Sequence, residues 1–363
     1  MAVIKTGARD LWIEQKALRA GFSSPQTFAE NFNLKGYRLA QLYRAATREL
    51  VEDVGQVTVL PKELRAALAA AEFRFHSAAP LAVQHSNDGQ TTKGLFGLID
   101  GSQVEAVLME HHGDRNTVCI SSQAGCAFKC EFCSTGQAGF TRQLLAVEIF
   151  DQALYFARSL AQHGKRITNV VFMGMGEPFH NYDAVMAAVT LLNDPQGFGL
   201  GHRHITISTV GLVPQIDRFV EEGVQVNLAI SLHAPDDATR SNIMPVNKRY
   251  PVAELMAACA RYVARTNRKI FFEYVMLAGV NDSDGHARDL ARLMAGHLYH
   301  VNLIPYNSTP GALFTGSGDA RIRAFASILN RAGVPTTVRQ HMGRDIAAAC
   351  GQLRVQTQPR ALA

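Results

Sequence analysis

The sequence lacks the features of a membrane protein and of a disulfide-stabilised secreted protein. No run approaches the roughly 20 consecutive apolar residues that a membrane-spanning helix needs, and the first residues carry no apolar secretory segment. Cysteine is scarce, with 6 in 363 residues, which favours a reducing compartment over a disulfide framework. The net charge is only +5, which permits a nucleic-acid partner without requiring one. We therefore expect a cytoplasmic protein with no membrane partner.

Three of these cysteines stand close together. Cys126, Cys130 and Cys133 form a C-x3-C-x2-C pattern. Three thiolates on one loop can bind three irons of a 4Fe–4S cluster and leave the fourth iron open to a small molecule. The alternative is a structural zinc site, which needs four closed ligands and would take a distant fourth such as His111 or His112.

Strand-like and helix-like patterns alternate from about residue 117. The predicted strands are residues 118–121, 170–173, 205–209, 226–232, 270–276, 300–304 and 336–339. The predicted helices between them are residues 148–162, 182–192, 213–222, 252–266, 285–295 and 321–332. Repeated strand–helix units imply a parallel sheet covered by helices. The number of units fits an incomplete barrel better than an eightfold one.

The first 75 residues differ, because they show helical periodicity without strand alternation. Basic residues recur there beside Tyr37 and Tyr43, which indicates either a solvated helical face or an RNA-binding surface. The basic residues are Lys35, Arg38, Arg44, Arg48, Lys62 and Arg65. Residues 93–109 then predict a hairpin around the Asp100-Gly101 turn.

Four polar motifs lie at or just after the ends of predicted strands, where the ligands of α/β barrels bind. They contain Gly176 and Glu177, Ser208, the run Ser231-Leu232-His233, and Asn307. Each alone fits a turn, a helix cap or a core hydrogen bond. Four together at one rim favour a ligand site.

At this point the motifs become specific. Together they resemble the RlmN/Cfr family of radical S-adenosylmethionine (SAM) methyltransferases, which act on adenosine in RNA. The matching segments are residues 125–133, 174–178, 207–211, 231–234, 244–247, 274–282 and 345–353. The resemblance implies an α/β fold in which an incomplete (β/α)6 barrel carries a small N-terminal helical domain. Its divisions here are a helical RNA-binding domain (1–75), a linker and hairpin (76–115), the radical SAM core (116–345) and a tail (346–363).

The resemblance also implies a role for each matching residue. Cys126, Cys130 and Cys133 would hold the cluster, and SAM would contact Gly176, Glu177, Ser208, Ser231, Leu232, His233 and Asn307. Cys350 would be the cysteine that accepts a methyl group, Cys119 its partner thiol and Glu105 the proton acceptor. Without the resemblance, Cys119 and Cys350 are typical of small buried residues, and Cys259 matches no motif and is expected in the core.

The implied reaction uses two SAM molecules for each methyl group. One methylates Cys350, and the second yields a 5′-deoxyadenosyl radical that removes a hydrogen atom from that methyl. The carbon radical adds to adenine, a base removes the ring proton, and Cys119 attacks Cys350 to form a disulfide and release RNA. The implied partners are ribosomal RNA, transfer RNA and a low-potential electron donor such as flavodoxin or ferredoxin, and the expected state is a monomer.

Residues 133–137 and 176–178 resemble the branch that methylates carbon 2 of adenine. The alternative is the Cfr-like branch, which methylates carbon 8 and confers antibiotic resistance. Ser308 and Ala347 depart from the family pattern, the first beside Asn307. Two other classes stay open: a non-catalytic zinc-loop RNA-binding protein, and a radical SAM enzyme with a small-molecule substrate. The basic helical region and the tail cysteine argue against the small-molecule enzyme.

Overall fold

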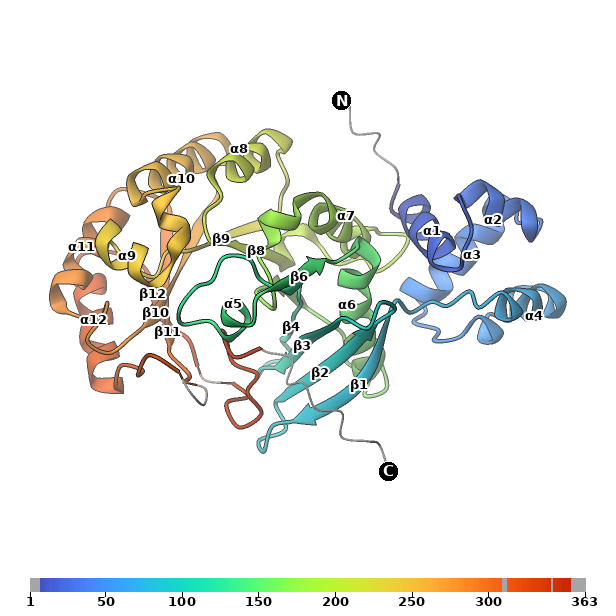
Figure 1. Ribbon diagram of the computed structural model, residues 1–363, viewed down its shortest axis with the longest axis horizontal. Coiled ribbons are helices and arrows are strands. Elements are labelled where there is room, and N and C mark those ends of the chain that lie inside the picture. The colour runs from blue at the N-terminus through green and yellow to red at the C-terminus, as the bar shows by residue number, and fades with distance from the viewer. Residues whose placement is uncertain (1–6, 309–311, 341, 354–363) are drawn as a thin grey trace.

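The computed structural model describes residues 7–308, 312–340 and 342–353. Its main feature is a ten-stranded sheet in the order β1-β2-β3-β4-β7-β8-β9-β10-β11-β12 (Figure 1). From β4 onward every neighbouring pair is parallel. These strands are β4 (Asn116–Cys119), β7 (Asn169–Phe172), β8 (Ile205–Thr209), β9 (Asn227–Ser231), β10 (Ile270–Met276), β11 (Tyr299–Pro305) and β12 (Thr336–Val338). The expected α/β fold with a partial barrel is confirmed.

Helices cover the outer face of the parallel strands because each strand is followed by an amphipathic segment (Figure 1). They are α6 (Ala146–Ala161), α7 (Tyr182–Asn193), α8 (Val213–Glu222), α9 (Asp237–Ile243), α10 (Val252–Thr266), α11 (Asp284–Met294) and α12 (Asp319–Arg331). In α8, Val213, Ile216 and Phe219 recur every three residues and are buried, and Gly223 ends the helix in the left-handed region.

Three antiparallel strands extend the sheet: β1 (Ala78–His85), β2 (Thr91–Leu98) and β3 (Gln103–Glu110). The β2–β3 hairpin was predicted, and Gly101 occupies its turn at φ +83°. The segment expected to be a linker contains β1 instead. This edge strand is exposed along all but its first residue and is interrupted by an irregularity at Pro80, so it lacks the alternation that marks a half-buried strand.

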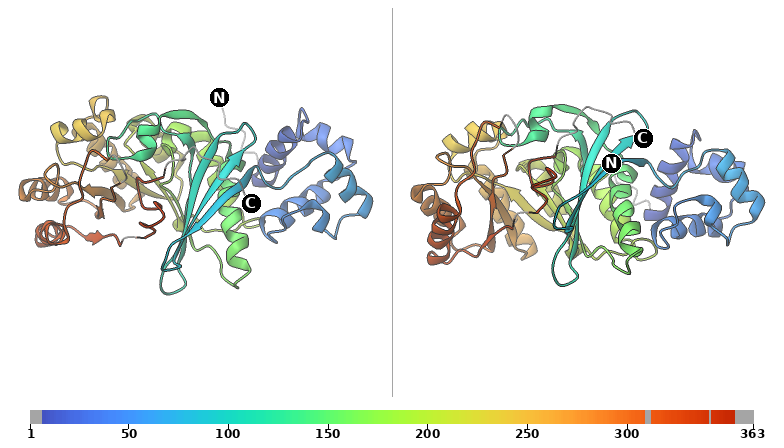
Figure 2. Two further views of the ribbon diagram at one scale, coloured as in Figure 1. Left: turned by 60° about the horizontal axis from the view of Figure 1, so that its bottom comes forward. Right: turned by 90° about the horizontal axis from the view of Figure 1, so that it is seen from below.

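The N-terminal helices form a small bundle beside the barrel (Figure 2). They are α1 (Ala8–Arg19), α2 (Pro25–Asn31), α3 (Gly36–Thr47) and α4 (Lys62–Ala70). Trp12, the single tryptophan of the sequence, is fully buried and packs edge-on against Tyr43 and Phe73. Tyr43 is therefore a core residue of the bundle and is not available to stack on a base.

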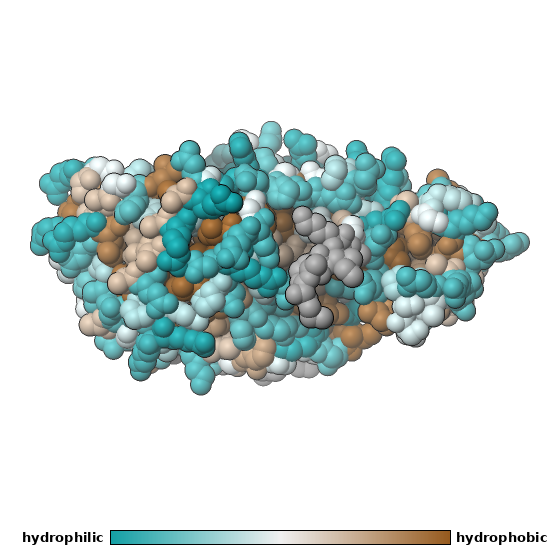
Figure 3. Space-filling model, turned by 90° about the horizontal axis from the view of Figure 1, so that it is seen from above, coloured by the Kyte–Doolittle hydropathy of each residue, from teal (hydrophilic) through white to brown (hydrophobic). Residues whose placement is uncertain are grey.

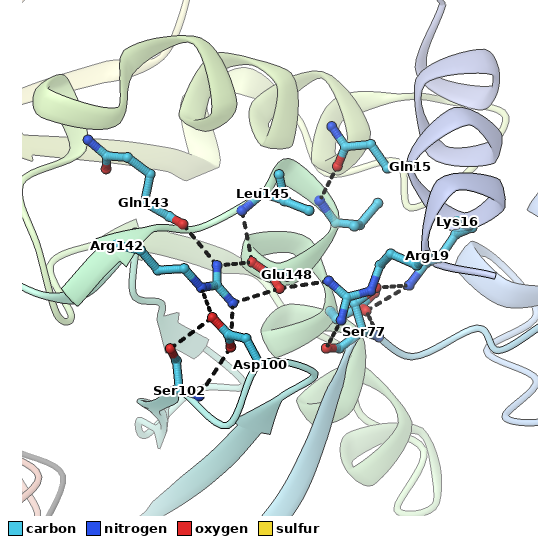
Figure 4. A network of polar contacts seen from close by, with 12 residues as sticks. Gln15, Lys16, Arg19, Ser77, Asp100, Ser102, Arg142, Gln143, Leu145 and Glu148 are labelled. Atoms are coloured by element: carbon cyan, nitrogen blue, oxygen red, sulfur yellow. Dashed lines mark hydrogen bonds and ion pairs between the residues drawn. The ribbon is translucent and has the colours of Figure 1, made fainter. Parts of the chain in front are cut away.

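Buried polar contacts join α1 to α6 and so connect the bundle to the barrel (Figure 4). Lys16 Nζ lies 2.8 Å from Asp151 Oδ2 and donates to Ser77 Oγ at 2.7 Å. Arg19 and Arg142 both pair with Glu148, at 2.7 and 2.8 Å. These contacts lock α1 against the core of the barrel.

Breaking the Lys16–Asp151 pair should destabilise the fold strongly. Burial lowers the pKa of Lys16, and the Asp151 carboxylate opposes this effect. Asp151→Asn would leave the ammonium group buried without a counter-charge, so we expect the free energy of unfolding to fall by about 3–5 kcal/mol in urea denaturation. Asp217→Asn, which breaks an exposed pair with Arg261, is the control and should cost about 0–1 kcal/mol. Equal losses in the two variants would contradict this account.

Hydrophilic residues cover most of the face shown in Figure 3. In the part of the chain that the structure describes, no helix has the length and apolar character needed to cross a bilayer.

Candidate active site

The cysteine loop is closed at its base by two short strands, β5 (Gln123–Gly125) and β6 (Phe140–Gln143). The Cys126 amide donates to the Gly139 carbonyl at 2.7 Å. Gly125 has φ +77°, and a Cβ there would lie 2.0 Å from that same carbonyl oxygen, so only glycine fits. The loop then runs into the short helix α5 (Ser134–Ala138). All three loop cysteines line one cavity of about 150 Å³, which we call the cysteine cavity.

The electrostatics of the loop fit an iron cluster. Burial raises the pKa of Cys126 to about 12 and also raises the pKa of Cys130 and that of Cys133. Thiols buried in this way become thiolates only when cations replace their protons, and cluster irons are such cations. The donor set therefore suits a cluster with three cysteine ligands and one open iron.

The described residues do not form an assembled zinc site. Among the described residues, no group of three or more His, Cys, Asp or Glu side chains is placed to hold one metal ion. A single zinc ion requires ligands that converge on one point, whereas cluster thiolates each bind a different iron. His111, one of the two candidate fourth ligands, lines a separate cavity.

Replacing one loop cysteine tests the cluster. Anaerobically reconstituted wild-type protein should contain about four irons with labile sulfide, and Cys130→Ala should lose most of both. The control is Cys259→Ala, because Cys259 is fully buried in α10 and is expected to be a core residue. Iron and sulfide analysis decides the question. Unchanged iron content in Cys130→Ala would rule out Cys130 as a ligand.

The strand ends bring most of the predicted SAM residues to the cysteine cavity. Its lining includes Gly176, Glu177, Ser208, Ser231 and His233. Leu232 is fully buried and lies outside the described lining. Asn307 lines the neighbouring, larger cavity.

Glu177 is held in place by the backbone. Its two carboxylate oxygens accept hydrogen bonds from the amides of Phe179 and Val210, at 2.9 and 2.8 Å. Burial nevertheless raises the pKa of Glu177 to about 7. Near neutral pH this carboxyl group therefore exists in both protonated and ionised forms, so it can donate a hydrogen bond to a ligand or accept one from it.

His233 is a neutral imidazole in this site. Burial, followed by the nearby Arg240, lowers its pKa to about 3. Its Nδ1 accepts the amide hydrogen of Val275 at 3.0 Å, which leaves the proton on Nε2. The ring also packs edge-on against Phe132 of the cysteine loop, with centroids 4.7 Å apart.

Arg240 is a buried positioning residue that sequence reasoning missed. Its guanidinium donates to the carbonyls of Leu232 and Val210, at 3.1 and 2.7 Å, and so ties together the segments that follow β8 and β9. It also donates to Asn247, which belongs to a segment that the family resemblance had singled out. Asn247 therefore helps to hold the guanidinium of Arg240 in place.

Two further cysteines meet at the larger cavity, whose volume is about 540 Å³ and which we call the thiol cavity. Cys119 at the end of β4 and Cys350 in the tail both line it, and Cys350 also lines the cysteine cavity. Burial, and then the nearby Cys350 thiol, raise the pKa of Cys119 to about 12. The structure therefore brings together two thiols that are far apart in the sequence.

The tail is attached directly to the cysteine loop. The amide of Ser134 donates to the Gly351 carbonyl at 2.8 Å, and the Thr135 hydroxyl donates to the Leu353 carbonyl at 2.6 Å. These contacts place Cys350 beside the candidate cluster site.

Glu105 has the least geometric support of the predicted residues. It is buried in β3, and its carboxylate lies 3.4 Å from Lys93 Nζ. It lies outside the described linings of both cavities. It does share one face of β3 with Met109, which lines the thiol cavity.

A second polar group that sequence reasoning missed separates the two cavities. Glu273 on β10 lines the cysteine cavity, while Asn302 and Arg339 line the thiol cavity. Arg339 pairs with Glu273 at 2.9 Å, and its other terminal nitrogen lies 3.9 Å from Cys350 Sγ. The available signal was one acidic residue within an otherwise apolar or aromatic strand, Ile270–Met276.

Comparisons with known proteins agree with this geometry. Residues 120–291 match the model of the radical SAM superfamily. The chain is 50% identical over 328 residues, covering 87% of it and 86% of the relative, to a probable dual-specificity RNA methyltransferase RlmN of Chloroflexus aurantiacus. It is 41% identical over 343 residues, covering 93% and 98%, to the ribosomal RNA large subunit methyltransferase Cfr of Clostridium botulinum.

A solved structure is similar over nearly the whole chain. The crystal structure of a radical SAM methyltransferase from Sphaerobacter thermophilus superposes with a TM-score of 0.87 at 47% identity. The similarity covers 98% of this chain and all of the other. The similarity is therefore not confined to the barrel and includes most of the helical bundle.

Proposed function

This chain belongs to the RlmN/Cfr family of radical SAM RNA methyltransferases, and we propose that it methylates carbon 2 of an adenosine in 23S ribosomal RNA and in transfer RNA. The observation that carries this proposal is the meeting of Cys119 and Cys350 at one cavity, directly beside the cysteine loop. A methyl transfer that passes through a protein cysteine needs this arrangement. A zinc-loop binding protein does not need it.

The proposed steps give a role to five sets of residues. A cluster held by Cys126, Cys130 and Cys133 would, with SAM bound, supply the 5′-deoxyadenosyl radical. The residues that line the cysteine cavity would bind and orient SAM. The Cys350 thiolate accepts a methyl group from one SAM, and the carbon it carries later joins adenine. The ring proton leaves, and Cys119 attacks the Cys350 sulfur, so that the disulfide forms as the bond from that sulfur to the transferred carbon breaks. The freed carbon takes up a proton to become the methyl group, and the one unpaired electron left from the radical addition passes to an external carrier. External reductant later restores both thiols. Glu105 as the acceptor of the ring proton stays a prediction.

Carbon 2 is proposed over carbon 8 on two segments of the sequence. The runs Cys133-Ser134-Thr135-Gly136-Gln137 and Gly176-Glu177-Pro178 resemble the carbon-2 branch. One relative is named a probable dual-specificity RNA methyltransferase and another a ribosomal RNA large subunit methyltransferase, which favours RNA as the substrate and ribosomal RNA as one kind of it. Transfer RNA as a second substrate rests on the family resemblance. Nucleoside analysis of purified ribosomal and transfer RNA, from cells with and without this gene, tests both substrates separately. Unchanged 2-methyladenosine in both RNAs on loss of the gene would refute the proposal.

The helical bundle is proposed to dock the RNA. Lys35 and Lys62 are exposed on the bundle, and Tyr37 is 55% exposed. Other basic residues are engaged within the protein: Arg44 pairs with Glu49 at 3.1 Å, and Arg48 donates to the Pro195 carbonyl at 2.7 Å. The exposed lysines and Tyr37 are therefore the better candidates for contact with RNA.

Charge reversal tests this role without removing the bundle, which shares buried pairs with the barrel. Lys35→Glu and Lys62→Glu should each weaken RNA binding and reduce the slope of log affinity against log salt by about one. Arg265→Glu, an exposed reversal on α10 at the far side of the barrel, is the control. Salt titrations of RNA binding measure the slopes. If both lysine variants show the same slope as the control, these helices present a solvated face that does not contact RNA.

A further inference from the structure

Glu273 presents one satisfied and one unsatisfied carboxylate oxygen. Its side chain is only 4% exposed. The first oxygen, Oε1, accepts hydrogen bonds from Asn302 Nδ2 and Arg339 Nη2, each at 2.9 Å. The second, Oε2, is buried and has no hydrogen-bond partner among the described residues. A buried acceptor without a donor is costly, so the site is incomplete as it stands.

The position of Glu273 shows where the missing donor would come from. In the parallel register, Glu273 on β10 is paired with Ser231 on β9. Ser231 Oγ lies 3.4 Å from Ser208 Oγ on β8. Three polar side chains from consecutive strands thus line the cysteine cavity. A ligand that reaches the two serines has Glu273 as its next polar neighbour.

The contacts of Glu273 also prepare it for a ligand. Asn302 and Arg339 hold Oε1, so the carboxylate plane is set before any ligand arrives, and little entropy is lost when a donor binds. A carboxylate accepts two donors at one oxygen and a third at the other without rearrangement. The geometry therefore suits a neutral hydroxyl donor placed between the serines and β10.

We propose that Glu273 Oε2 accepts a hydrogen bond from a ribose hydroxyl of the adenosyl group bound in the cysteine cavity. The inference rests on the proposed SAM site and adds a binding residue that lies outside the motifs of the sequence. The same Arg339 that holds Glu273 lies 3.9 Å from Cys350 Sγ. The sugar of the ligand and the methyl-accepting thiol are therefore connected through one carboxylate–guanidinium pair.

Binding of ribose-modified ligands tests the proposal without measuring turnover. The cluster-loaded protein, kept oxidised, is titrated calorimetrically with S-adenosylhomocysteine and with its 2′-deoxy and 3′-deoxy analogues. Wild-type protein should bind one of the deoxy analogues about 10-fold or more weakly, as expected for a hydrogen bond to a charged group. In Glu273→Gln and in Glu273→Met this penalty should shrink several-fold, whatever the change in overall affinity. The matched control is Glu110→Gln, because Glu110 on β3 forms an ion pair with Lys165 near the surface. This variant should keep the wild-type penalty.

The outcomes are distinguishable. Equal binding of all three ligands by wild-type protein, or an undiminished penalty in both Glu273 variants, would overturn the role of Glu273 while leaving the SAM site intact. A uniform loss of affinity for all ligands in the variants, with the penalty unchanged, would show a purely structural role. Wild-type protein that fails to bind S-adenosylhomocysteine at all would overturn the proposed SAM site and this inference with it.

Discussion

Cys119→Ala protein should remain covalently joined to its RNA. The carbon carried by Cys350 would still add to adenine, because that step uses Cys350 and the cluster. Release requires a thiolate that attacks the Cys350 sulfur, and Cys119 is the thiol that shares the thiol cavity with it. With alanine in its place, the thioether link has no resolving partner, so an adduct should build up towards one RNA per protein chain.

Denaturing electrophoresis of labelled RNA shows such an adduct directly, and nuclease digestion followed by peptide mass spectrometry locates it at Cys350. Cys259→Ala is the matched control, because Cys259 is also buried yet lies in α10. It should release free product. If Cys119→Ala turns over normally and releases free methylated RNA, Cys119 has no resolving role and is only a buried strand residue.

Cys350→Ala should abolish RNA methylation altogether. The variant lacks the sulfur that accepts the first methyl group, so no carbon is available to join adenine. The cluster loop keeps its three cysteines, and reduced protein should therefore still cleave SAM to 5′-deoxyadenosine without methylating RNA. Mass spectrometry of the tail peptide should find a methyl group on Cys350 in active wild-type protein. Methylated RNA produced by Cys350→Ala would contradict the proposed route.

Combining the two substitutions tests whether the covalent link to RNA is made through Cys350. The double variant Cys119→Ala/Cys350→Ala should form no adduct, because the link is made through Cys350. An adduct that persists in the double variant would place the covalent link on another residue.

The sequence predicted the barrel closely where local patterns are strong. The bounds of α8 and α10 and of β8 and β10 agree to the residue, because apolar runs there are bounded by Pro and Gly or by polar segments. The strand β1 was missed because an exposed edge strand carries no apolar alternation. Local pattern thus predicts buried elements better than edge elements.

The site was predictable only in part. The loop cysteines and the strand-end residues form local motifs, and the structure brings most of them to one cavity. Glu273 lies on β10, a strand buried on both faces, where alternation does not show which residues point into the barrel. Arg339 follows the exposed edge strand β12, where no apolar pattern indicates which way a side chain points. The position of Cys350 depends on contacts between Ser134 and Gly351, more than 200 residues apart, which no local pattern encodes.

One measurement tests the central claim, which is methylation of carbon 2 through a cysteine-bound carbon. Reduced, cluster-loaded protein is given RNA and SAM whose methyl group carries three deuterium atoms, and the RNA is digested to nucleosides for mass spectrometry against standards. Removal of one deuterium atom from the Cys350 methyl predicts 2-methyladenosine with two deuterium atoms in its new methyl group. A product that keeps all three deuterium atoms, or one that coincides with 8-methyladenosine, would contradict the account.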